Sequence, residues 1–144
     1  MMRVSVVVNN FNYARFLGDA IRSGLEQTWP DTEVVVVDDG STDNSREVIA
    51  AFGDQIRTVL KDNGGQGSAY NAGFAAATGD AIIFLDADDT LLPTTAEHVA
   101  TAFQTHPDAG KVQYRLAEVD ADLVPTGAHK PPLDRHMQIG RAHV

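Results

Sequence analysis

The chain has 144 residues, 43% of them apolar and 22% charged, which is typical of a soluble globular domain with its own core. Its formal net charge is −9 and its lysines and arginines do not cluster. This argues against nucleic acid as a partner, because affinity for nucleic acid depends largely on neutralising phosphates. The absence of cysteine excludes disulfides and thiolate chemistry.

The first apolar run covers only residues 4–8, which is too short for a signal peptide or a membrane span. The lack of cysteine is also compatible with a reducing compartment. We therefore expect a cytoplasmic protein. We leave open an association with the inner face of a membrane, through a part of the parent protein beyond this sequence.

Secondary structure alternates along the first two thirds of the chain. Four short segments rich in β-branched and apolar residues predict buried strands, at 4–8, 33–38, 56–60 and 81–85. Helical spacing of apolar or small residues predicts helices over 14–27, 44–52 and 68–77, and a fourth with Pro93 as its first residue. This alternation predicts an α/β fold, with a Rossmann-like, mostly parallel sheet flanked by helices.

The pattern weakens after residues 111–115. We interpret 119–126 as a hairpin or an edge segment, and 127–133, which contains two prolines, as a loop.

Polar clusters follow three of the four predicted strands, at residues 9–12, 38–41 and 86–89. In sheets of this kind, ligands bind beyond the carboxyl ends of the strands. The clusters therefore predict one binding site at this edge of the sheet.

Asp86 and Asp88 are candidate ligands for Mg²⁺ or Mn²⁺, which prefer carboxylate oxygens and keep positions open for phosphate. The spacing alone equally allows residues 88–90 to cap the following helix. Residues 38–41 likewise either contribute a carboxylate to a nucleoside or only form a turn. The glycine-rich residues 63–67, including Gly67, precede a helix, so their backbone N–H groups are suited to a diphosphate. The five histidines show no metal-ligand spacing.

Three motifs in order resemble glycosyltransferase family 2, which has the GT-A fold. VSVVVNNFNYARFL is similar to the opening strand of that family, EVVVVDDGSTDNS to its second motif, and NGGQGSAYNAGFAAATGDAIIFLDADDTLLP to its third block, which ends in the D-x-D motif. The resemblance extends over about residues 3–104, with a weaker echo to about Leu133. Each piece alone is weakly specific, whereas the ordered set is highly specific.

The resemblance implies roles for individual residues. Asn10, Phe11 and Asn12 would line the nucleoside pocket, and Asp39 would bind the base through an imide N–H. Asp86 would lie near the ribose and the metal, and Asp88 would be the main metal ligand.

Three positions depart from the family pattern. Asn9 stands where the family often has proline, and Phe11 stands where it has tyrosine. Tyr70 stands where many members have an arginine that helps to hold the diphosphate, which puts phosphate affinity or donor identity in doubt.

The implied reaction is inverting transfer of a sugar from a nucleoside diphosphate sugar to a hydroxyl of a carbohydrate, lipid or protein acceptor. Family members carry the catalytic base in a second half. We therefore expect this chain to be a donor-binding fragment without a base, and inactive as it stands. No motif promotes the late carboxylates Asp120, Asp122 and Asp134 to that role.

We expect a nucleotide-sugar-binding domain over 1–118 and an incomplete acceptor-side region over 119–138. Residues 139–144, IGRAHV, match one reading frame of a common sequencing adapter, and we interpret them as an artefact. A natural terminus is the alternative.

Two other functions compete with this one. A sugar nucleotidyltransferase would also use an α/β sheet, but the glycine-rich loop it needs after the first strand is absent. A non-catalytic nucleotide-sugar-binding module becomes the better description if the chain is complete.

Overall fold

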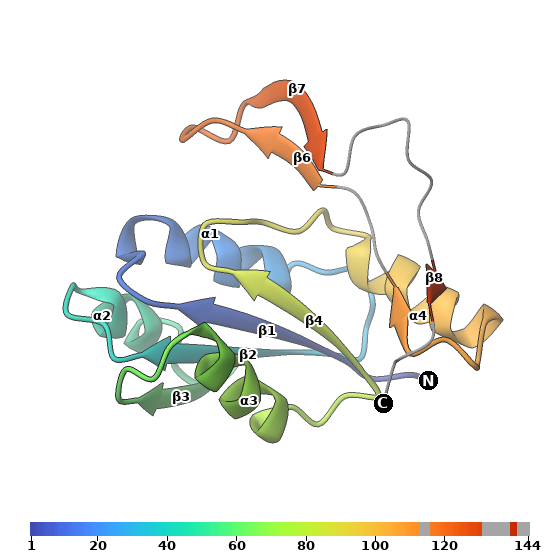
Figure 1. Ribbon diagram of the computed structural model, residues 1–144, viewed down its shortest axis with the longest axis horizontal. Coiled ribbons are helices and arrows are strands. Elements are labelled where there is room, and N and C mark those ends of the chain that lie inside the picture. The colour runs from blue at the N-terminus through green and yellow to red at the C-terminus, as the bar shows by residue number, and fades with distance from the viewer. Residues whose placement is uncertain (113–115, 131–138, 141–144) are drawn as a thin grey trace. The chain divides into compact units, whose positions relative to one another are not determined.

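The computed structural model describes residues 1–112, 116–130 and 139–140 of the chain (Figure 1). The chain divides into two compact units, Met1–Ala100 and Thr101–Val144, and each is described by itself. The predicted domain boundary at residue 118 and the predicted artefact at 139–144 stay predictions.

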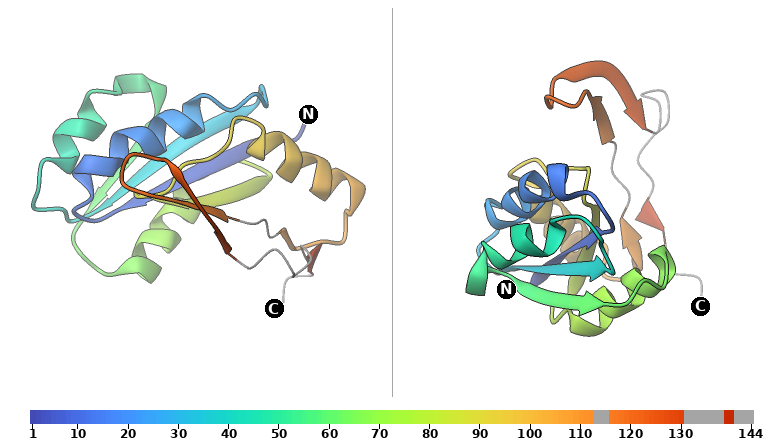
Figure 2. Two further views of the ribbon diagram at one scale, coloured as in Figure 1. Left: turned by 90° about the horizontal axis from the view of Figure 1, so that it is seen from above. Right: turned by 90° about the vertical axis from the view of Figure 1, so that its left-hand side faces the viewer.

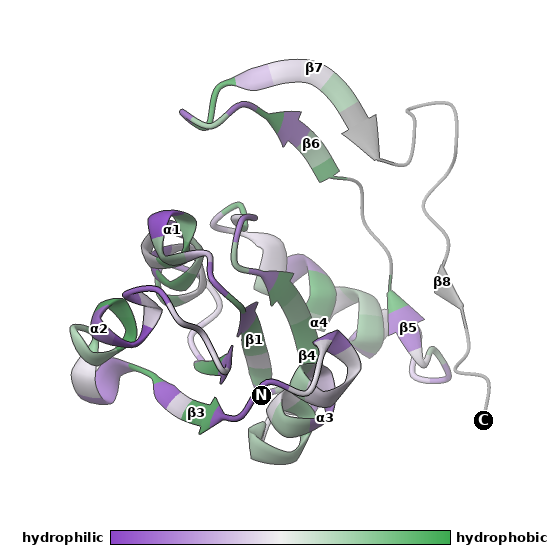
Figure 3. Cartoon of the chain, turned by 60° about the vertical axis from the view of Figure 1, so that its left-hand side comes forward, coloured by the Kyte–Doolittle hydropathy of each residue, from purple (hydrophilic) through white to green (hydrophobic). Residues whose placement is uncertain are grey.

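The first unit is built on a four-stranded sheet in which all strands run parallel, in the order β3-β2-β1-β4. Its strands are β1 (Val4–Asn10), β2 (Thr32–Asp39), β3 (Arg57–Lys61) and β4 (Ala81–Asp86). Strands β1 and β4 are hydrophobic along most of their lengths (Figure 3). The predicted α/β fold with a mostly parallel sheet is confirmed.

Helices cover both faces of this sheet (Figure 2). A Cβ atom added at Gly24 of α1 would lie 3.0 Å from Val34, and one added at Gly73 of α3 would lie 3.2 Å from Val37. The side chains of Val34 and Val37 point to opposite faces of the sheet, because these residues are three positions apart on β2. Helix α1 therefore packs on one face and α3 on the other. The helices are α1 (Ala14–Leu25), α2 (Ser45–Ala50), α3 (Gln66–Ala76) and α4 (Thr95–Thr105), with a 3₁₀ turn at Gly53–Gln55.

Small residues bring α3 close to the sheet. Val7, Val35 and Val37 form a buried cluster with Ala69. At Gly73 any side chain would collide with Val7, so only glycine allows this close approach.

The fourth helix begins two residues later than predicted. Pro93 lies in the turn before it, where its carbonyl accepts a hydrogen bond from Thr28 N at 2.8 Å. The Gln27 side chain caps the helix from a distance, because its Oε1 accepts from Ala96 N at 2.8 Å. Pro93 as first helical residue was therefore wrong, because a distant glutamine fixes the start of α4.

The second unit contains two antiparallel strand pairs. Its strands are β5 (Lys111–Val112) with β8 (Ile139–Gly140), and β6 (Leu116–Val119) with β7 (Pro125–Lys130). The predicted hairpin is confirmed. The predicted loop was wrong for residues 127–130, which belong to β7, and residues 131–133 lie outside the described part. The turn is closed by Asp120 Oδ1, which accepts from Asp122 N at 2.9 Å and Val124 N at 3.0 Å.

No helix in the described part of the chain is long and apolar enough to cross a bilayer.

A carboxylate joins three segments at the amino-terminal end of the sheet. Glu33 Oε1 accepts hydrogen bonds from Ser5 Oγ at 2.6 Å and from Thr78 N at 2.6 Å, and Glu33 Oε2 accepts one from Arg3 at 3.2 Å. Burial by itself raises the pKa of Glu33, but the hydrogen bonds from Ser5 and Thr78 outweigh it and hold the pKa below its ordinary value of 4.5.

We expect Glu33→Gln to lower the free energy of unfolding by about 1–2 kcal/mol at pH 7, because it weakens charge-assisted bonds. A lowered folded-state pKa means that the ionised side chain stabilises the fold above pH 4.5, and that this contribution is lost as the pH falls below that value. The difference between the two proteins should therefore shrink between about pH 5 and pH 3. Urea unfolding across this range is the measurement, with exposed Glu26→Gln as the control. A difference independent of pH would contradict the expectation.

Candidate functional site

The strand order reverses at one place along the sheet. From β1 the chain moves outward to β2 and β3, and then α3 carries it back across the opposite face to β4 on the other side of β1. In doubly wound sheets, ligands bind beyond the carboxyl ends of the strands at such a reversal. Here the reversal lies between β1 and β4, next to Asn9 and Asp86, which are register partners.

Three aspartates gather at the end of β4. Carboxylate oxygens of Asp86, Asp88 and Asp89 lie within 4.8 Å of one another, and Asp86 and Asp88 are exposed. The turn is fixed by Asp89 N, which donates to Asp86 O at 3.0 Å, and by buried Ala87, whose N–H donates to Asn9 O at 3.1 Å. An all-oxygen donor set with open positions suits Mg²⁺ or Mn²⁺. The capping alternative does not fit, because α4 begins only at Thr95.

Asp38 is wholly buried and organises the loop after β2. Its Oδ1 accepts from Ser41 Oγ at 2.6 Å and Asn10 Nδ2 at 2.9 Å, and its Oδ2 accepts from Arg46 Nε at 3.0 Å. Burial alone raises the pKa of Asp38, but the bonds from Ser41, Asn10 and Arg46 lower it below its usual range. These contacts give Asp38 a structural task.

Asp39, the predicted acceptor for the base, is bonded to the loop before α3. Its Oδ1 accepts from Lys61 Nζ at 2.6 Å and Gly64 N at 3.0 Å, and its Oδ2 accepts from Gly65 N at 3.0 Å. Burial raises the pKa of Asp39, but Lys61 and the two backbone N–H groups outweigh it and lower the pKa. Sequence reasoning missed Lys61, which has no signal beyond a cation at the end of a strand.

The three residues predicted along the nucleoside pocket differ in accessibility. Phe11 is 45% exposed, whereas Asn10 is 2% exposed and bonded through Nδ2 to Asp38. Asn12 has a positive φ of 57°, and its Oδ1 accepts from Thr42 N at 2.7 Å, so it joins the loops after β1 and β2. Gly67 lies in the first turn of α3, where an added Cβ would meet nothing within 4 Å.

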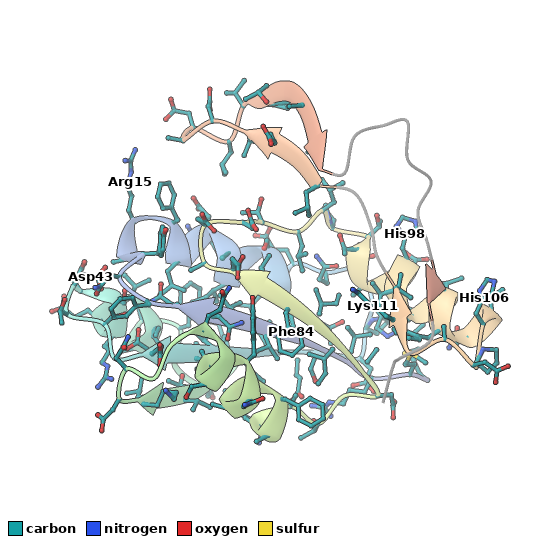
Figure 4. All side chains as sticks on the ribbon, in the orientation of Figure 1. Arg15, Asp43, Phe84, His98, His106 and Lys111 are labelled. Carbon is teal, nitrogen blue, oxygen red and sulfur yellow. The ribbon has the colours of Figure 1, made fainter. Side chains whose placement is uncertain are left out.

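Tyr70 connects α3 to the aspartate cluster. Its hydroxyl donates to Asp86 Oδ1 at 3.3 Å and accepts from Gln66 Nε2 at 2.9 Å. Its ring packs edge-on against Phe84 of β4, with centroids 5.0 Å apart. Figure 4 labels Phe84. Tyr70, where many members of the family that the sequence resembles have arginine, therefore places a neutral hydroxyl beside Asp86, a candidate metal ligand. His98 lies on α4 and His106 just beyond it, and neither belongs to the aspartate cluster.

A parallel sheet with helices on both faces, a reversal of strand order and an acidic turn at that reversal define an α/β protein of the GT-A type. The chain belongs to glycosyl transferase family 2, because the model of that family matches residues 5–141.

Relatives and solved structures agree with this assignment. An uncharacterized glycosyltransferase of Nostoc sp. is 48% identical over 125 residues, which cover 84% of this chain and 38% of the relative. The glycosyltransferase GlyG of Streptococcus pneumoniae is 34% identical, and the matched region covers 84% of this chain and 37% of GlyG. The chain thus spans somewhat more than a third of these relatives.

Two solved structures resemble the fold. S. aureus TarS in complex with UDP superposes with a TM-score of 0.67 at 27% identity, covering 74% of this chain and 33% of that one. A mannosyltransferase of Pyrobaculum calidifontis in complex with GDP-Man and Mn²⁺ superposes with a TM-score of 0.64 at 26% identity, covering 83% and 36%.

Proposed function

We propose that this chain is the donor-binding part of an inverting, metal-dependent glycosyltransferase. The observation that carries the proposal is the exposed cluster of Asp86, Asp88 and Asp89 at the reversal of strand order. It is supported by the neighbours solved with UDP and with GDP-Man and Mn²⁺. The donor is a nucleoside diphosphate sugar and the acceptor offers a hydroxyl group.

In this proposal each side chain has a defined task. Asp88, with Asp86, would hold Mg²⁺ or Mn²⁺, and the bound cation would supply positive charge beside the diphosphate. Phe11 stacks on the base of the nucleotide. Asp39 releases its hydrogen bond from either Gly64 N or Gly65 N, and accepts one from an N–H group of the base instead. The released N–H group, at the start of α3, then faces the phosphates.

The catalytic base and the acceptor site belong, in this proposal, to the part of the relatives that this chain does not span. The Nostoc relative is covered only to 38% of its length. In the described part of the chain, Asp120 is occupied by closing a turn, which makes it a poor candidate for a base.

Titration calorimetry with UDP and GDP tests the metal site. We expect binding of at least one of them in Mn²⁺ to be tenfold or more tighter than in EDTA, about 1.4 kcal/mol, because the acidic edge repels an unshielded diphosphate. Asp88→Asn should remove this difference without changing the thermal midpoint, since the residue is exposed.

The matched control is Asp54→Asn, which removes one exposed carboxylate from the 3₁₀ turn and leaves the cluster intact. It should keep the Mn²⁺ effect. Equal affinity in Mn²⁺ and EDTA for the wild-type protein would refute metal dependence, and no binding of either nucleotide would refute the donor site itself.

A further inference from the structure

A buried side-chain amide at the end of β1 has no hydrogen-bond partner in the described part of the chain. Asn9 is 9% exposed, and both its Nδ2 and its Oδ1 are shielded from solvent and unbonded. Asn10 differs, because its Nδ2 is bonded to Asp38 and only its Oδ1 is unpaired. A buried polar group that lacks a partner destabilises a fold, so an amide unpaired at both atoms requires an explanation.

The register places Asn9 in the middle of the candidate site. Its partners are Val37 on β2 and Asp86 on β4, and partners on neighbouring parallel strands point to the same face. That face is the one covered by α3, since Val7, two positions earlier, packs against Ala69. Asn9 therefore lies beside Asp86, at the reversal of strand order.

We propose that Asn9 is a specificity-determining residue that recognises the ribose of the donor. On binding, its amide donates to and accepts from the ribose hydroxyls, and so gains the partners that it lacks in the free protein. This inference rests on the proposed donor site. It adds to it a residue that the family resemblance does not supply, since proline is frequent at this position.

The chemistry of the amide favours ribose over the base. A carboxamide offers one donor and one acceptor side by side, and each ribose hydroxyl both donates and accepts. Asn9 adjoins Asp86, whereas the side chain assigned to the base, Asp39, lies at the end of β2. Because Asn9 is buried, access to its amide requires neighbouring side chains to move. Tyr70 of α3 donates one hydrogen bond of 3.3 Å to Asp86, the register partner of Asn9.

The inference predicts opposite effects on stability and on binding. Asn9→Leu, of similar shape but without polar atoms, should raise the thermal midpoint of the free protein by about 3 °C, because it removes a buried unpaired group. The same variant should bind UDP at least tenfold more weakly in Mn²⁺. It should also lose the ability to distinguish UDP from 2′-deoxyUDP and 3′-deoxyUDP.

The wild-type protein should prefer UDP over at least one of the deoxy nucleotides by about tenfold, the effect of one lost hydrogen bond to a buried group. Asn9→Thr keeps a group that donates and accepts, and should retain part of this preference. GDP should lose affinity for Asn9→Leu by the same factor as UDP, because the ribose is common to both.

Each possible failure has a distinct signature. If the wild-type protein binds neither UDP nor GDP, the proposed donor site fails and the inference fails with it. If UDP binds but the deoxy nucleotides bind equally well, the ribose role alone is overturned. A lower thermal midpoint for Asn9→Leu would mean that the amide is already satisfied in the free protein, and would also overturn it. A loss confined to UDP would reassign Asn9 to the base.

Discussion

Sugar transfer by the 144-residue chain is expected to be at least about 100-fold slower than transfer by the same chain extended with the continuation of the Nostoc relative. A general base contributes about 10²–10⁴-fold to the rate, and positioning of the acceptor contributes more through proximity. Donor binding should change much less, because the proposed donor groups lie in the part that both proteins share. Donor binding by calorimetry and product formation by chromatography separate the two effects.

The extended chain with Asp88→Asn should lose transfer, which ties the gained activity to this site. Equal transfer rates for the short and the extended chains would refute the assignment of the base to the missing part. Attention would then turn to Asp120, Asp122 and Asp134, the last of which lies outside the described residues.

Replacement of Asp39 is expected to affect the fold as well as the site. Asp39→Ala should lower the free energy of unfolding by about 2–4 kcal/mol, because it leaves Lys61 and two backbone N–H groups without their acceptor. Asp39→Asn keeps the shape but loses the charge beside Lys61, and should cost about half as much. Urea unfolding of the nucleotide-free protein is the measurement.

A matched control is available one residue beyond Lys61. Asp62 is exposed, and Asp62→Ala should change stability by less than about 0.5 kcal/mol. If Asp39→Ala proves as stable as this control and yet fails to bind nucleotide, the loop contacts are incidental and Asp39 serves the ligand alone. A loss of stability with unchanged nucleotide affinity would assign it to the loop alone.

The parts of the fold that depend on local pattern could be predicted from the sequence. Runs of valine and isoleucine identified β1, β2 and β4, because buried parallel strands are apolar on both faces. The predicted burial was wrong for β3, which lies at the edge of the sheet and whose residues are exposed or half-buried. The aspartates after β4 were also predictable as a group, since they directly follow an apolar strand. Their carboxylate oxygens lie within 4.8 Å of one another because the three residues belong to one turn.

Features that depend on distant partners were not predictable. The start of α4 is set by Gln27, and the contacts of Asp39 come from Lys61 and Gly64, far along the chain. Strand β7 has the sequence PTGAHK, whose polar residues do not alternate with apolar ones, so no period of two indicates a strand. The unpaired state of Asn9 follows from its neighbours in three dimensions.

The central place of β1 has a consequence for the order in which the site is made. During synthesis, β1, β2 and β3 can pair before β4 emerges, because β1 and β4 are joined through partners as distant as Val4 and Ala81. Such non-local pairing is slow. We therefore expect the half of the candidate site at Asp39 to form before the half at Asp86. Only the docking of β4 completes the candidate site, so a nucleotide bound there would stabilise the last strand to join the sheet and make its loss less frequent.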